Sequence, residues 1–312
     1  MSEVVLEITG LVRTFGDVHA VQDVSFSVER GQVLGFIGPN GAGKTTTMRI
    51  VATLDTPDAG DVRVGAFSVV EDPEAVRQVV GFMPDYAGVY SNTTVEEYLD
   101  FFARANDLRG EARRKAVEHI IEFMSIGDLR DRQVESLSKG LKQRVALGRA
   151  IIHDPEVLIL DEPAANLDPR ARIEFRTLIR ELAADGKTIL LSSHILTEMS
   201  EMCDAVTVIE KGRVLATGSV KDVMERVKKR RQLWVRVAGA LLPVERMLIE
   251  QPGVTNVHEA GDRLQFDFDG GDAEQVQLIG RRVAAGLPIL EFTAHGADLE
   301  DLFIEITEGR LQ

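Results

Sequence analysis

The stretch Gly38-Pro39-Asn40-Gly41-Ala42-Gly43-Lys44-Thr45 decides the fold, because it matches the phosphate-loop pattern G-x-x-x-x-G-K-[S/T] at every fixed position. It follows a short apolar run at residues 33–37 and leads into a helical pattern beginning near Lys44. Glycines let the backbone N–H groups turn inward around phosphate oxygens, and the N-terminus of the following helix adds partial positive charge. A glycine-rich turn that binds nothing is the alternative, but the flanking strand and helix favour a nucleotide site. We expect Lys44 to reach the β- and γ-phosphates and the Thr45 hydroxyl to ligate Mg²⁺.

Two further apolar runs end in residues suited to phosphate chemistry. Residues 157–160 are followed by Asp161 and Glu162, and residues 188–191 are followed by Ser192, Ser193 and His194. Acids after a strand are often only solvated caps, and a lone histidine is usually a surface residue. Because both runs accompany a phosphate loop, we expect Asp161 to lie near the metal and Glu162 to be the general base that activates water. His194 is the candidate for a hydrogen bond to the γ-phosphate or the attacking water.

The chain predicts one α/β domain over residues 1–230 that contains a helical insertion at about 91–150. Apolar runs alternate with helical segments, which is typical of a parallel sheet. Residues 206–209 and 213–216 flank Lys211-Gly212 and so indicate a hairpin. Within the insertion, Thr94 stands three residues before Glu97, the spacing of a capping box. Apolar residues then recur at helical spacing through residues 117–124.

Residues 231–312 predict a second, smaller α+β domain. Alternating apolar patterns at 233–237, 264–268 and 287–293 indicate strands, and helical segments are expected around 244–250 and 273–283. A last helix carries Leu299, Leu302, Phe303 and Ile306 on one face. The predicted order is strand, helix, strand, strand, helix, strand, helix, which is that of a ferredoxin-like sandwich with an added helix. The basic run ERVKKRR at 225–231 is either a solvated helix end or a contact for acidic headgroups or a partner.

Composition narrows the class of protein. The 312 residues carry a net charge of −14, which argues against a protein that binds the phosphate backbone of nucleic acid. The single cysteine, Cys203, excludes a disulfide within the chain and indicates a reducing compartment. Residues 1–10 show no signal-peptide pattern, and no apolar run reaches the roughly 18 residues that span a bilayer. These features predict a cytoplasmic protein whose role at a membrane would come through a partner.

The run Leu137-Ser138-Lys139-Gly140-Leu141-Lys142-Gln143-Arg144 resembles the signature motif of ABC ATPases. Ser138 is placed to cap a helix whose N-terminus can face an anion. In that family the anion is the γ-phosphate of ATP held by the other subunit, so the resemblance implies that ATP joins two copies, or close paralogues, head to tail. Ser138 and Gly140 would make those contacts.

Other residues match the family pattern over roughly residues 3–220. Phe15 matches the aromatic that stacks on adenine, and Thr46 matches the second hydroxyl of the Walker A motif. Asn166-Leu167-Asp168 matches the D-loop, in which Asp168 couples the two sites of the dimer, and His194 matches the switch histidine. The resemblance thus implies ATP and Mg²⁺ as ligands.

Three positions depart from the pattern. Asp85 stands where the family has the Q-loop glutamine; it could approach Mg²⁺ directly or through water but has no amide donor. Lys139 replaces a small residue and either adds attraction to the γ-phosphate or points to solvent. Leu141 replaces a glutamine and leaves the serine and glycine contacts intact.

The chain is therefore similar to the ATPases of bacterial ABC-2-type exporters, including the drug-resistance branch, which work beside a separate membrane permease. The resemblance implies a subunit held peripherally on the inner face of the cell membrane, where the helical insertion and the loop around Asp85 would receive a cytoplasmic helix of the permease. The alternative is a soluble ABC ATPase that acts on nucleic acid or ribosomes. The short interval between the phosphate loop and the signature, the single cassette and the acidic charge all disfavour it. A phosphate-loop kinase or GTPase would not explain the signature and the D-loop.

Overall fold

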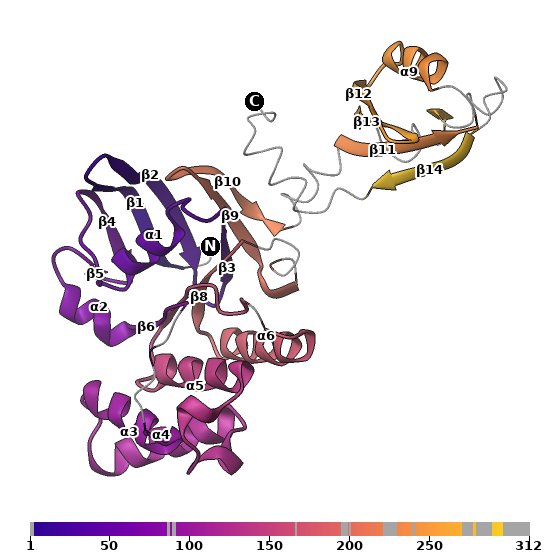
Figure 1. Ribbon diagram of the computed structural model, residues 1–312. Helices are drawn as coiled ribbons and strands as arrows, with labels where there is room; N and C mark the ends of the chain where they lie inside the picture. The colour runs from indigo at the N-terminus through magenta and orange to yellow at the C-terminus, as the bar shows by residue number, and fades with distance from the viewer. Residues whose placement is uncertain are drawn as a thin grey trace. The chain divides into compact units, whose positions relative to one another are not determined.

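The structure is a computed structural model that describes residues 3–85, 88, 92–165, 167–194, 199, 201–220, 230–238, 241–269, 277–278 and 289–295. The chain divides into two compact units, Met1–Ser219 and Val220–Gln312 (Figure 1). The boundary predicted after residue 230 stays a prediction. Asn166, the basic residues 225–229, most of the helix expected at 273–283 and the expected last helix lie outside the described residues.

A six-stranded sheet forms the centre of the first unit, in the order β10-β9-β3-β8-β7-β6. Its parallel strands are β6 (Val80–Met83), β7 (Val157–Leu160), β8 (Thr188–Ser193), β3 (Val33–Ile37) and β9 (Ala205–Glu210). The predicted hairpin pairs β9 with β10 (Arg213–Ser219) in antiparallel fashion. Strands β3, β7 and β8 are buried at every residue, as expected for a parallel sheet covered on both faces.

The strand register places the predicted site residues at one edge of this sheet. Ile37 of β3 lies beside Ser193 of β8, and Leu160 of β7 lies beside Leu191. The phosphate loop follows Ile37, and the pair Asp161-Glu162 follows Leu160. Because the carboxyl ends of parallel strands share an edge, segments far apart in the sequence meet there.

The N-terminal part of the first unit forms an antiparallel sheet that was not predicted from the sequence. Its order is β2-β1-β4-β5, and its strands are β1 (Val4–Phe15), β2 (Val18–Glu29), β4 (Ala59–Val64) and β5 (Phe67–Ser68). The rings of Phe26 on β2 and Phe36 on β3 lie 5.1 Å apart between their centroids, so the two sheets share a core. Helix α1 (Lys44–Val51) contributes Met48 and Ile50 to that core, and α2 (Pro73–Val79) precedes β6.

The predicted insertion is helical. Helices α3 (Val95–Ala105), α4 (Gly110–Phe123) and α5 (Lys139–Ile151) gather together (Figure 1), with short 3₁₀ turns η1 (Gly127–Leu129) and η2 (Val134–Ser136) between α4 and α5. The capping box at Thr94 is present: its hydroxyl accepts from the Glu97 N–H, and the Glu97 carboxylate accepts from the Thr94 N–H. Helix α6 (Pro169–Ala184) follows β7 and packs beside α5.

The second unit has its own sheet and core. Strands β11 (Arg230–Val237), β12 (Val254–Ala260), β13 (Arg263–Asp269) and β14 (Ile289–His295) are all antiparallel, in the order β12-β13-β11-β14. Helix α9 (Leu242–Ile249) connects β11 to β12 and buries Val244 and Leu248. This is the strand order of a ferredoxin-like fold, in agreement with the prediction.

Candidate functional site

The phosphate loop connects β3 to α1 in a conformation that only glycine permits at two positions. A side chain at Gly38 would place its Cβ 2.3 Å from the carbonyl oxygen of Ile209. Gly43 has a φ of +107°, and a Cβ there would lie 2.4 Å from the carbonyl oxygen of Ala20. The glycines therefore let the loop pass close to neighbouring backbone and begin α1 at Lys44.

Lys44 points into the loop at the start of α1. Its ammonium donates to the carbonyl oxygens of Gly38 (2.7 Å) and Pro39 (3.2 Å), and it lies 3.4 Å from a carboxylate oxygen of Glu162. The side chain is buried. The remaining predicted loop residues Asn40 and Gly41 are exposed, whereas Ala42 is buried.

Asp161 is a buried carboxylate at the end of β7. Burial raises its pKa, against hydrogen bonds from the Ser192 and Thr45 hydroxyls, and the neighbouring carboxylates of Glu162 and Asp85 raise it further. The structure thus brings Thr45, Asp85 and Asp161 into one electrostatic environment. Thr45 and Asp85 are exposed and Thr46 is half-buried, so all three remain accessible to a ligand.

The side chains of Glu162 and His194 are in contact at the edge of the sheet. His194 Nδ1 lies 2.8 Å from Glu162 Oε2, while the other oxygen of this carboxylate faces Lys44. Glu162 has a φ of +47°, a left-handed conformation that is uncommon for a residue with a side chain. Strained backbone of this kind is frequent at functional sites. Lys44, Glu162 and His194 thus lie close together, although they follow three different strands of the sheet.

Two buried polar residues that the sequence analysis did not assign hold this segment in place. Ser192 on β8 donates to Asp161 Oδ1 (2.7 Å) and accepts from the Glu162 N–H (2.8 Å). Gln143 on α5 donates to the Pro163 carbonyl oxygen (2.8 Å). The signal for Ser192 is its place two residues before His194. Its partners are 30 and 31 residues away and could not be identified from spacing alone.

Ser138, Gly140 and Asp168 lie apart from these contacts and share a cavity of about 160 Å³ between α5 and α6. Ser138 caps α5 by accepting from the Leu141 N–H (3.4 Å), and Asp168 caps α6 by accepting from the Arg170 and Ala171 N–H groups (3.0 and 2.9 Å). Lys139 is exposed at the first position of α5. Among the described residues that line the cavity, none belongs to the phosphate loop.

Phe15 stands at the end of β1 with 45% of its surface exposed. The Arg13 guanidinium lies 4.6 Å from the centroid of its ring. Arg13 is in turn held by Asp55 (2.8 Å) and Asp58 (2.9 Å). One face of the ring is therefore supported by a fixed cation, which leaves an exposed aromatic surface for a planar ligand.

The donors at the sheet edge suit magnesium. Within the described residues, no three His, Cys, Asp or Glu side chains form a cage for a metal ion. Mg²⁺ does not need such a cage, because it is commonly bound by one or two carboxylates together with substrate phosphates. The adjacent oxygens of Thr45 and Asp161 are hard ligands of that kind.

Comparisons with known proteins identify the relatives of this chain. The profile of the ABC transporter family matches residues 21–165. The chain is 34% identical to the Nod factor export ATP-binding protein I of Ralstonia nicotianae over 97% of this chain and 94% of that protein. It is 30% identical to the linearmycin resistance ATP-binding protein LnrL of Bacillus subtilis over 98% and 99% of the two chains.

A solved structure of an ATP-binding cassette of an ABC transporter, in its ADP conformation, has the same fold. Its TM-score is 0.65 and its identity is 26%, and the match covers 73% of this chain and 97% of that one. In the part of this chain that the structure describes, no helix is long and apolar enough to cross a bilayer. The phosphate loop, the sheet edge and the full-length relatives together lead to one assignment: the chain belongs to the ABC transporter family, as a nucleotide-binding ATPase.

Proposed function

We propose that this chain hydrolyses ATP to power export through a separate membrane permease. The observation that carries the proposal is the meeting of Lys44, Glu162 and His194 at one sheet edge, with 3.4 Å and 2.8 Å between their polar atoms. A phosphate-binding cation beside a carboxylate and an imidazole that can orient water suits hydrolysis of a γ-phosphate. The names of the two relatives, one for export and one for drug resistance, support the direction of transport.

ATP would occupy the phosphate loop with its adenine on Phe15. Lys44 would exchange its contacts with loop carbonyls for the β- and γ-phosphates, and Thr46 would lie near the α-phosphate. Thr45 and Asp161 would hold Mg²⁺, and the exposed Asp85 would approach it directly or through water. Bound there, Mg²⁺ would supply neutralisation of phosphate charge.

Glu162 would act as the general base. Its carboxylate would take the proton from a water molecule that attacks the γ-phosphate in line with the leaving oxygen. His194, 2.8 Å from the same carboxylate, would orient that water or contact the γ-phosphate. The backbone of Glu162 is held by Ser192, so the base would be positioned before ATP arrives.

A second copy, or a close paralogue, would complete each site. Ser138 and Gly140 would face the γ-phosphate held by the other copy, with Asp168 at the shared boundary. Their common cavity is the supporting observation, since it presents the N-terminus of α5 to an outside anion. ATP would thus hold the dimer together, and hydrolysis would release it.

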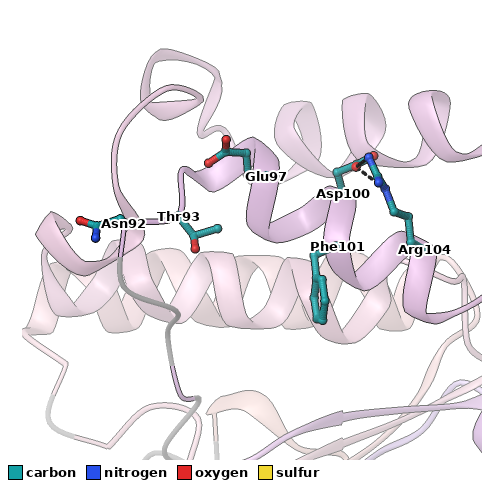
Figure 2. Close-up of a pocket in the computed structure, with 6 residues that line it drawn as sticks. All are labelled: Asn92, Thr93, Glu97, Asp100, Phe101 and Arg104. Atoms are coloured by element: carbon teal, nitrogen blue, oxygen red, sulfur yellow. Dashed lines mark hydrogen bonds and ion pairs between the residues drawn. The ribbon is translucent and has the colours of Figure 1, made fainter.

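The permease would dock on the helical insertion, which would place the chain on the inner face of the cell membrane. A cavity of about 550 Å³ lies at the start of α3 (Figure 2). Phe101 is 48% exposed there, while Asp100 is paired with Arg104 and Glu97 accepts from the Thr94 N–H. The exposed ring suits a cytoplasmic permease helix that offers an apolar side chain.

Replacing Glu162 with glutamine tests the mechanism. Because Glu162→Gln loses the base but keeps its size, we expect ATP binding to persist, turnover to fall by at least about 100-fold, and an ATP-bound dimer to accumulate. Phosphate release and size-exclusion chromatography with ATP measure these effects. Normal turnover in this variant would exclude the proposed role.

Affinity capture of the chain from its own cells tests the partner. We expect a multi-span membrane protein to co-purify. Recovery of ribosomes or nucleic acid without a permease would instead support the alternative class of soluble ABC ATPases, which the net charge of −14 disfavours.

A further inference from the structure

Ser192 occupies an unusual position in the centre of the site. It lies on β8 with 0% of its surface exposed, two residues before His194. Its hydroxyl donates to Asp161 Oδ1 at 2.7 Å, a length typical of a strong hydrogen bond to a charged oxygen. The Ser192 Oγ also accepts from the backbone N–H of Glu162 at 2.8 Å.

The two groups that Ser192 contacts both need a fixed orientation. Asp161 is buried, so a carboxylate oxygen without a donor there would be costly. Glu162 has a φ of +47°, which persists only when its surroundings hold it. One hydroxyl satisfies both requirements because it can donate and accept at the same time.

We propose that Ser192 is a positioning residue that sets the direction of the Asp161 carboxylate and of the Glu162 backbone. The proposal rests on the function proposed above, in which Asp161 faces Mg²⁺ and Glu162 activates water. Ser192 occupies one acceptor site on Oδ1, so the other lone pairs of the Asp161 carboxylate are those that would face the metal. The Glu162 side chain is directed by its backbone toward the space between Lys44 and His194.

Ser192 touches no substrate atom in this arrangement, so its loss should alter turnover and metal use rather than ATP capture. The phosphate loop would supply the ATP contacts, and among the described residues Ser192 reaches this loop only through Asp161, which also accepts from the Thr45 hydroxyl. Loss of a residue that orients a metal ligand typically lowers metal affinity or activity about 10- to 100-fold. Alanine cannot replace either hydrogen bond, whereas threonine keeps the hydroxyl.

Ser68 provides a matched control far from the site in sequence. It is also buried, donates to an aspartate (Asp61 Oδ1, 2.8 Å) and accepts from two backbone N–H groups, those of Val70 and Glu71 (3.1 Å each). Ser68→Ala therefore removes the same chemistry from β5, where no predicted site residue lies. Any loss of stability common to buried serines appears in both variants.

The experiment compares Ser192→Ala, Ser192→Thr and Ser68→Ala in the full chain. We expect Ser192→Ala to lower kcat about 10- to 100-fold with little change in the ATP affinity measured without Mg²⁺, and Ser192→Thr to restore most of kcat. ATP affinity, titrated with MgCl₂ and with EDTA, adds a readout independent of turnover. The gain in affinity that MgCl₂ brings should shrink in Ser192→Ala and stay unchanged in Ser68→Ala.

Several results would overturn the proposal. One is a Ser192→Ala variant with the kcat and the Mg²⁺ response of the wild type. Another is a loss of kcat in Ser68→Ala as large as that in Ser192→Ala. A third is a folded Ser192→Thr variant whose kcat is as low as that of Ser192→Ala. If Ser192→Ala does not fold, Ser192→Cys replaces it in the test, because the weak S–H donor of cysteine should also lower kcat. Wild-type turnover in Ser192→Cys would refute the positioning role. Glu162→Gln separates the two hypotheses: normal turnover in it rejects the mechanism, whereas an inactive Glu162→Gln beside a normal Ser192→Ala rejects only Ser192.

Discussion

Phe15 allows a sharp test of where the adenine binds. Its ring is 45% exposed at the end of β1, and Arg13 covers one side at 4.6 Å. Arg13 cannot easily move away, since both Asp55 and Asp58 hold its guanidinium. Phe15→Ala would remove the aromatic surface while leaving this ion-pair network in place. A change in nucleotide affinity would then report on the ring itself.

The size of the effect follows from stacking. An aromatic side chain stacked on a base contributes about 1–3 kcal/mol when tested by alanine substitution. At about 1.4 kcal/mol for each tenfold change, the Kd for ATP should rise about 5- to 150-fold. The free energy of unfolding should change little, because nearly half of the ring already faces solvent.

Calorimetric titration with ATP and with inorganic tripolyphosphate measures this prediction. Tripolyphosphate carries the phosphates but no adenine, so Phe15→Ala should weaken ATP binding and leave tripolyphosphate binding unchanged. Phe15→Tyr is the control, since it keeps an aromatic ring, and its Kd for ATP should stay near that of the wild type. An equal loss for both ligands would mean that Phe15 shapes the phosphate loop instead. No loss for either ligand would place the adenine elsewhere.

Two further predictions concern pH and the second unit. Burial lowers the pKa of His153, against its hydrogen bond to the Val80 carbonyl oxygen. The neutral imidazole therefore contributes fully to the stability of the fold above the unfolded pKa of about 6.5. This contribution is lost as the pH falls through the lowered pKa of the folded state. Urea unfolding at about pH 7.5 and 5.5 should therefore show a smaller loss in His153→Gln than in the wild type, and an equal loss would contradict this assignment. Removal of Val220–Gln312, which has its own core, should weaken dimerisation and leave ATP binding intact. Light scattering and ATP titration check this, and unchanged dimerisation would show that the second unit does not support the dimer.

Elements with strong local signals could be predicted from sequence. The buried strands β3 and β7 and the capping box at Thr94 each depend on neighbouring residues, and their positions were predicted correctly. Strand β8 extends two residues beyond the predicted end, to Ser193, because it continues to pair with β3 there.

The antiparallel sheet of β1, β2 and β4 gave no comparable signal. Its strands are irregular: the pairing of β1 with β2 shifts register at four places, and Gly10 interrupts β1 with a φ of +58°. Such irregularities disturb the period of two on which strand prediction depends. The strand becomes recognisable only when its partner is known.

Some residues of the candidate site could be predicted from the sequence and others could not, again because only some have a local signal. Motif residues such as Lys44 and Glu162 could be identified because a short local pattern surrounds each of them. Ser192 and Gln143 could not be assigned, because their roles come from contacts 30 and 20 residues away in the chain. Only the strand register and the packing of α5 determine which groups they reach.

Two hydrogen bonds from different elements hold the backbone that follows β7. Ser192 binds Glu162 from the sheet, while Gln143 binds the next residue, Pro163, from α5. Both of these polar side chains are buried, so breaking either bond would leave a buried group unpaired at a cost of about 1–3 kcal/mol. Helix α5 also begins at the Ser138 cap, five residues before Gln143. One helix therefore carries both the cap that lines the cavity between α5 and α6 and the side chain that holds the Pro163 carbonyl, so it connects this cavity to the segment that bears Glu162.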